Sequence, residues 1–306
     1  MQNELFMNYN MFNDYHIHYY LDGCASGEMA LPQIDEACRE LNIAQGGILK
    51  HYSHALPYGG DNFIYWHRIK QGEWARFLAE FAFYKPKYTR FFSGVETELL
   101  NQNGDINIPH EEQKKVDFVG LSVHFMPELN CLRFDLPCSP DLDFVPANEP
   151  EKRAENERHI SRWVEKCADA GADRIIEGTA QAYINAIKKN PRIRSLTHMG
   201  DGMSVLRTYK INTESVSLKK RLEILEPLMK LAAEREIVWE LTADGAAGGD
   251  EQILLHANRL GVGFAATADA HQLYNGWAPL SNHVKAEKVI ERLMLNSKTI
   301  LSGLTT

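Results

Sequence analysis

The amino-acid sequence predicts an α/β fold formed by a single domain over residues 1–306, a TIM-like barrel in which a parallel sheet of seven strands is closed or nearly closed. Seven short apolar runs are joined by connections long enough to hold helices, and no hairpin signature lies between them, so the strands should be parallel. Histidines and acidic residues follow most of these runs, at the strand ends where barrels carry their functional groups. No glycine-rich phosphate loop follows the first run, which disfavours an open doubly wound sheet.

The first half of the chain alternates apolar runs with helical patterns. The first strand is expected to end in the segment Asp14–His18, and apolar side chains then recur at helical spacing over residues 31–41. Further strands are expected at residues 43–49, 90–95 and 116–123, and a helix at residues 66–84 that ends before Pro86.

The second half begins with a segment in which periodicity fails. Five prolines interrupt residues 125–150, which predicts an irregular loop insertion, either a lid over the site or a decorative element. After it, helices are expected at residues 151–170, 179–189, 218–235, 251–260 and 286–295, a flexible turn at residues 245–250, and strands at residues 193–197, 237–241 and 262–267.

Composition restricts the class of protein. A hydrophobic content of 44% in 306 residues allows a large core, and a net charge of -8 disfavours nucleic acid as a partner and favours a small ligand. No run of about 18 apolar residues and no export signal at residues 1–13 are present, so a cytoplasmic protein without a membrane segment is expected. The five cysteines form no Cys-x-x-Cys pair, which argues against a disulfide framework and a thiolate zinc site: Cys24, Cys38, Cys131, Cys138 and Cys167.

Histidines and acids gather at the predicted strand ends. His16 and His18 are two residues apart on a strand, so both side chains point to one face and can bind one metal ion. A neutral imidazole suits zinc, iron or manganese. Further donors follow later runs: His51, Glu96, His124, His198, Asp269 and His271. The remaining histidines, on predicted helices and loops, are expected to be solvated, with His54 ambiguous: His67, His110, His159, His256 and His283.

The order of these motifs resembles one enzyme family. From residue 14 to residue 271 the chain carries, in order, Asp14-Tyr15-His16-Ile17-His18, Asp22-Gly23, His51, Gly94-Val95-Glu96, Ser122-Val123-His124, His198 and Asp269-Ala270-His271. This set is similar to the pattern of the PHP family, named for polymerase and histidinol phosphatase. The resemblance implies a distorted (β/α)7 barrel that binds two or three divalent ions of zinc, manganese or iron.

The resemblance also implies which side chains would bind each ion. A first ion would be held by His16, His18, Glu96 and Asp269. Glu96 would bridge to a second ion, held by His124 and His198. A third ion would be held by Asp22, His51 and His271. Histidinol phosphatases of this family often have a loop rich in cysteine and histidine after His-x-His, whereas this chain has Tyr19-Tyr20-Leu21-Asp22-Gly23-Cys24.

The chemistry expected of such a centre is the hydrolysis of a small phosphate monoester, with histidinol phosphate as the first compound to test. A metal-bridging hydroxide would attack phosphorus, with Glu96 as the bridging ligand. Asp269 or His271 would pass a proton to the leaving group, with water as an equal candidate. Four basic residues in strand-end loops are candidates either for phosphate binding or for simple surface solvation: Lys50, Arg68, Arg133 and Arg207.

Three alternative functions remain open from the sequence. A binuclear amidohydrolase that breaks C–N bonds also begins with His-x-His, but its usual bridging group is a modified lysine, whereas this chain offers Glu96. A phosphodiesterase or nuclease of the PHP type would use the same metal centre. A metal-binding module without catalysis is disfavoured because the ligand set is complete.

Overall fold

The structure is a computed structural model, and it describes residues 12–52, 72–124, 126–132, 150–243 and 249–300. Several predictions fall outside these residues: the first part of the helix at 66–84, most of the insertion at 125–150, and most of the turn at 245–250. Arg68, Arg133, His54, His67 and Cys138 also lie outside them.

The sheet consists of seven parallel strands in sequence order, as predicted. Their bounds are β1 Phe12–His18, β2 Ile43–His51, β3 Arg90–Glu98, β4 Phe118–Ser122, β5 Ile193–Leu196, β6 Val238–Leu241 and β7 Gly263–Ala266. The segment after β7 returns to β1, where Ala270 accepts a hydrogen bond from His18 N and donates one to His16 O, each of 2.9 Å. The sheet is therefore nearly closed, which confirms the predicted (β/α)7 barrel.

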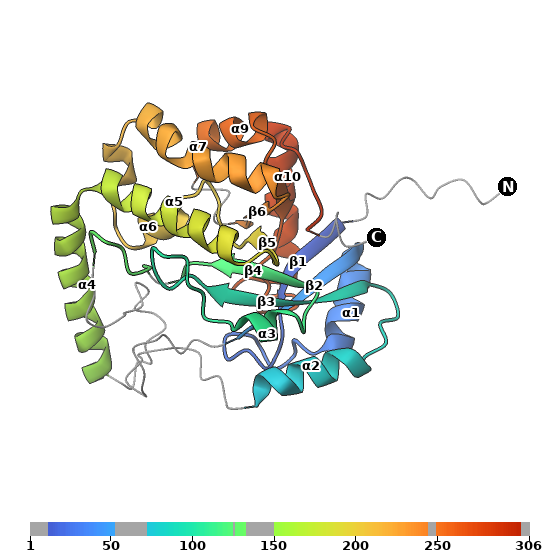
Figure 1. Ribbon diagram of the computed structural model, residues 1–306. Coiled ribbons are helices and arrows are strands. Elements are labelled where there is room, and N and C mark those ends of the chain that lie inside the picture. The colour runs from blue at the N-terminus through green and yellow to red at the C-terminus, as the bar shows by residue number, and fades with distance from the viewer. Residues whose placement is uncertain (1–11, 53–71, 125, 133–149, 244–248, 301–306) are drawn as a thin grey trace.

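Helices surround the strands (Figure 1). They are α1 Leu31–Glu40, α2 Glu73–Phe83, α3 His110–Gln113, α4 Pro150–Ala170, α5 Ala172–Lys189, α6 Ser204–Thr208, α7 Leu218–Glu234, α9 Glu251–Arg259 and α10 His283–Leu293, with 3₁₀ turns η2 Thr213–Ser215 and η3 Leu280–Asn282. In the described part of the chain, no helix is long and apolar enough to cross a membrane.

Two differences from the predicted elements have physical reasons. Helix α5 begins at Ala172 rather than Thr179, because Gly171 takes a left-handed φ of 83° that ends α4 and lets the next helix start at once. Helices α3 and α6 were not predicted, since four or five residues are too few to show a helical period.

The barrel interior is packed below the strand ends. A small apolar cluster fills it: Tyr15, Leu49, Phe118, Val238, Ala265 and Ile300. The Phe118 ring lies over Gly47 and Gly94 on the neighbouring strands, where an added Cβ atom would come within 2.8 and 2.5 Å of its Cζ atom. Because this ring occupies the interior, the polar side chains at the carboxyl ends of the strands lie above a packed apolar layer.

Candidate metal centre

Strand β1 presents both histidines of the His-x-His motif to the centre of the barrel. Its pairing with β2 shifts register between Asp14 and Ile17, an irregularity of the kind that redirects side chains near sites. The buried Asp14 carboxylate accepts from the backbone N–H groups of His16 and Ala268, each at 3.0 Å. Asp14 thus joins β1 to the segment that carries Asp269, and burial raises the pKa of its carboxyl to about 7.

A first donor group is formed by four side chains at the seam of the barrel, the place where the segment after β7 meets β1. His16 Nε2 lies 3.1 Å from His18 Nε2, 3.2 Å from Glu96 Oε2 and 3.1 Å from Asp269 Oδ1. His18 Nε2 lies 3.4 Å from Glu96 Oε2 and 3.2 Å from Asp269 Oδ1. Ligands bonded to tetrahedral zinc at 2.0–2.1 Å are about 3.3 Å apart, so this group fits a divalent ion.

A second donor group lies beside it, at the ends of β3, β4 and β5. Glu96 Oε1 is 2.9 Å from His198 Nε2 and 3.3 Å from His124 Nε2, and the two imidazole nitrogens are 3.2 Å apart. These spacings also fit three ligands of one ion. Glu96 Oε1 additionally accepts from the hydroxyl of Thr197 at 3.2 Å.

Glu96 is the residue shared by both groups. Its Oε2 faces the first group and its Oε1 faces the second. Burial would raise the pKa of this carboxyl, but the neighbouring charges of His51, His16 and His124 hold it well below the usual range. Glu96 is therefore an anion at neutral pH, as a bridging ligand must be.

Carboxylates behind the histidines orient three of them. His16 Nδ1 donates to Glu240 Oε2 at 2.7 Å, His18 Nδ1 to Asp22 Oδ2 at 2.9 Å, and His124 Nδ1 to Glu98 Oε2 at 2.8 Å. Such a bond fixes the tautomer with Nε2 free of hydrogen, which is the form that binds a metal. Glu240 and Glu98 were not among the predicted site residues. Glu98 is two residues after Glu96 on β3, so strand alternation could have found it, and Glu240 is a lone acid within an apolar run.

The three residues predicted to hold a third ion, Asp22, His51 and His271, all lie around His18. His51 Nε2 lies 3.4 Å from Glu96 Oε2, and the His51 ring stacks on His18 at 4.8 Å between centroids. The centroid of the His271 ring lies 4.2 Å from that of His18, and His271 Nδ1 donates to the backbone oxygen of Asp269 at 2.7 Å. Asp22 makes hydrogen bonds to the protein through both oxygens. His18, Asp22, Cys24 and His51 also form a compact donor group, so Cys24 is a further residue at this centre that the sequence did not single out.

The pKa values of the histidines follow their neighbours. Burial lowers the pKa of His18, but its hydrogen bonds to Asp22 and Asp269 outweigh burial and raise the pKa to about 9. The pKa of His124 is also raised to about 9, against burial, by the charges of Glu96 and Glu98. Burial and the charge of His18 lower the pKa of His271 to about 3. The two donor groups therefore contain strongly basic imidazoles, and His271, which lies next to His18, stays neutral.

The basic residues proposed for phosphate binding have protein partners where they are described. The Lys50 Nζ atom is fully buried and lies 2.7 Å from Asp22 Oδ1. The Arg207 guanidinium binds Asp201 through two hydrogen bonds of 3.0 and 2.6 Å. Both cations are thus engaged with carboxylates.

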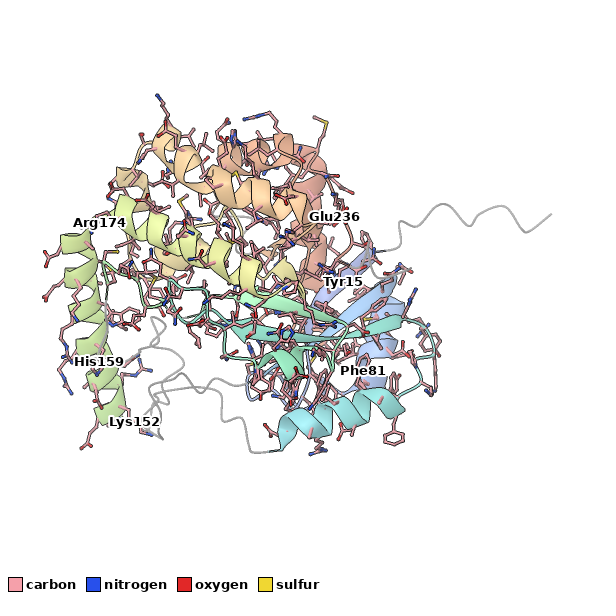
Figure 2. All side chains as sticks on the ribbon, in the orientation of Figure 1. Tyr15, Phe81, Lys152, His159, Arg174 and Glu236 are labelled. Atoms are coloured by element: carbon pink, nitrogen blue, oxygen red, sulfur yellow. The ribbon has the colours of Figure 1, made fainter. Side chains whose placement is uncertain are left out.

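The other histidines differ in exposure. His110 is exposed on α3, and His256 is half-buried on α9 beside Glu226. The expectation of solvation is wrong for His283, which is buried, donates through Nδ1 to Leu280 O at 2.8 Å and contacts the Phe12 ring edge-on. It is also wrong for His159, which is mostly buried on α4, well away from Tyr15 on β1 (Figure 2).

Comparison with known proteins shows a similarity in fold but none in sequence. No protein-family model matches the chain, and no curated protein matches its sequence. Among solved structures, it is similar to the histidinol phosphate phosphatase from Lactococcus lactis subsp. lactis Il1403, crystallised in complex with zinc, L-histidinol and phosphate. The similarity has a TM-score of 0.55 at 16% sequence identity and covers 94% of this chain and 95% of that one. The resemblance to a PHP-type histidinol phosphatase is therefore confirmed at the level of the fold.

Proposed function

We propose that the protein is a metal-dependent hydrolase of small phosphate monoesters, with histidinol phosphate as the first substrate to test. The observation that carries this proposal is the Glu96 carboxylate, whose two oxygens belong to two adjacent donor groups. His16, His18 and Asp269 would complete the first metal site, and His124 and His198 the second. Two ions held this way would lower the pKa of a bound water and offset the charge that builds on the phosphoryl oxygens.

The protein side chains near the reacting atoms constrain the proton donor. Asp269 has a pKa well below its usual range, because the charge of His16 and the hydrogen bonds from His16 and His18 outweigh burial, so its carboxylate carries no proton at neutral pH. His271 is neutral and donates its Nδ1 hydrogen to Asp269 O. Neither residue then has a proton to give, and water becomes the preferred donor to the leaving group.

Three features favour a phosphate monoester over the alternatives. The structural neighbour was crystallised with L-histidinol and phosphate, the two products of such a reaction, and the fold likeness covers most of both chains. An amidohydrolase would need a lysine in the bridging position, whereas Glu96 takes this place and the nearby Lys50 is paired with Asp22. The net charge of -8 disfavours a polyanionic nucleic acid.

A side-by-side assay tests the proposal. Protein loaded with zinc, manganese or iron is incubated with histidinol phosphate, sugar phosphates, a phosphodiester and an oligonucleotide, and released phosphate or cleaved product is measured. We expect turnover of at least one monoester, abolished by a chelator and restored by metal. Cleavage of the diester or oligonucleotide without any monoester turnover would contradict the proposed substrate class, and an absence of metal-dependent hydrolysis would contradict the function.

A further inference from the structure

Lys50 is a fully buried cation directly behind the candidate metal centre. It lies on β2 next to His51, and because neighbouring side chains on a strand point to opposite faces, Lys50 faces away from the side that His51 occupies. Its Nζ atom is 2.7 Å from Asp22 Oδ1 and donates to His51 O at 3.3 Å. A buried ammonium group needs a charged partner, so this ion pair ties Asp22 to the wall of the barrel.

Both oxygens of Asp22 already accept hydrogen bonds from the protein. Its Oδ1 accepts from Lys50 Nζ, its Oδ2 accepts from His18 Nδ1 at 2.9 Å, and both oxygens lie within 3.2 Å of the backbone nitrogen of His51. A carboxylate has about four acceptor positions, and these three donors, one of them shared by both oxygens, occupy most of them. A metal ion at Asp22 would compete with Lys50 and His18 for these oxygens, and displacing either one would leave a buried polar group without its partner.

We propose that Asp22 is a positioning residue, held by Lys50 to orient His18, and that the centre binds two divalent ions rather than the three that the family resemblance implies. Without Asp22, the third set keeps only His51 and His271 of its three donors, and protein metal sites generally use three or more side chains. The Lys50 ammonium would also repel a divalent ion placed at Asp22. This inference rests on the metal centre of the proposed function.

The number of bound ions tests the inference directly. The protein is equilibrated with saturating zinc or manganese, freed of excess metal by gel filtration, and analysed for metal per chain by mass spectrometry. We expect two ions per chain. Three ions per chain in a protein that hydrolyses monoesters would overturn this inference and leave the proposed function intact, whereas less than one ion per chain would overturn both.

Two substitutions separate positioning from ligation. Asp22→Asn should keep two ions at saturation while the affinity for one of them falls about 10–100-fold, because only the support of His18 is lost. Loss of an ion at saturation would overturn the positioning role.

Lys50→Met should weaken the affinity for the same ion, with rescue by Lys50→Arg. The exposed Lys219→Met serves as the control, and affinity in Lys50→Met equal to this control would overturn the role of Lys50. If Lys50→Met does not fold, Asp22→Asn still tests the positioning role, and the ion count of the unaltered protein still tests the number of ions.

Discussion

The two halves of the candidate metal centre differ in their access to solvent. In the half formed by β1, the side chains of His16 and His18 are 0% and 1% exposed, whereas in the half formed at the ends of β4 and β5 those of His124 and His198 are 21% and 22% exposed. We call these the inner and outer halves. An ion in the inner half would lie among buried imidazoles, with the 25% exposed Asp269 side chain at its edge, and we expect substrate to approach from the outer half.

The two halves also differ in how their histidines are held. Both inner histidines donate to a buried carboxylate, Glu240 for His16 and Asp22 for His18. In the outer half His124 has Glu98 behind it, and His198 takes a left-handed backbone conformation with a φ of 36°. A non-glycine residue in this region is strained by about 1–2 kcal/mol, so the surrounding loop must fix His198 in place.

The largest effect is expected from Glu96→Gln, because Glu96 belongs to both halves. The amide keeps the volume but removes the charge that faces both sites, so activity should fall on the order of 10³-fold, which is about 4 kcal/mol. Metal content should fall while the circular dichroism spectrum stays unchanged. The exposed Glu111→Gln is a matched control. Near-normal turnover and metal content in Glu96→Gln would show that the two halves are not joined through this carboxylate.

Stability should separate the inner half from the outer half. The His18 ring contacts those of both His51 and His271, so His18→Ala leaves a cavity and removes one of the hydrogen bonds that Asp22 accepts, and should lower the free energy of unfolding by about 3 kcal/mol or more. The more exposed His124→Ala should cost about 1 kcal/mol. Urea unfolding of both variants in a chelator measures the difference, and equal losses would contradict the comparison.

Metal binding should depend on pH in the same way in both halves. His18 and His124 each have a pKa of about 9, so both carry a proton at pH 7 and must release it to bind metal. For each of these protons, the affinity for the ion in that half should therefore rise about 10-fold per pH unit between pH 7 and pH 9. Because folding raises these pKa values above about 6.5, the chelator-treated protein should lose stability as pH rises from 6.5 through 9. Calorimetry in buffers of different ionisation enthalpy counts the protons, and release of none would contradict this prediction.

The smallest effects are expected from the carboxylates behind the histidines. Glu240→Gln should weaken the inner ion, and Glu98→Gln the outer ion, each by about 10–100-fold in affinity. Glu240 is fully buried, so its substitution should lie at the upper end of this range. Competition with a chromophoric chelator measures each affinity. If both variants weakened the same ion, the assignment of these carboxylates to separate halves would be wrong.

Local patterns in the sequence were enough for the strands and for most residues at their ends. His16, His18, Glu96 and Asp269 come together because parallel strands end at one edge of the barrel, which their position after apolar runs already indicated. That they bind metal stays a prediction. Lys50 was placed among the candidate phosphate ligands from its position at a strand end alone, and that role stays a prediction. Strand alternation turns its side chain away from the face of His51, and its ammonium group is paired with Asp22.

Contacts between distant strands could not be predicted in the same way. The hydrogen bond from His16 to Glu240 joins residues 224 positions apart, and it depends on the register in which the barrel closes. The periodicity of apolar residues along the chain does not predict that register. The burial of His283 is similar, because it follows from packing against Phe12 near the opposite end of the chain. Side-chain pairing across the seam therefore requires the three-dimensional structure.

The seam has a consequence for the order of events during synthesis. Asp14 and Ala268, which the seam joins, are 254 positions apart, and a ribosome adding about 5–20 residues per second needs roughly 10–50 s to make the chain between them. During that time His16, His18 and Glu96 have emerged without Asp269. A newly made chain therefore cannot complete the inner half until β7 has been translated and seated against β1. An ion held by all four side chains of this half would therefore bind only after barrel closure, and it would then join the last strand to the first.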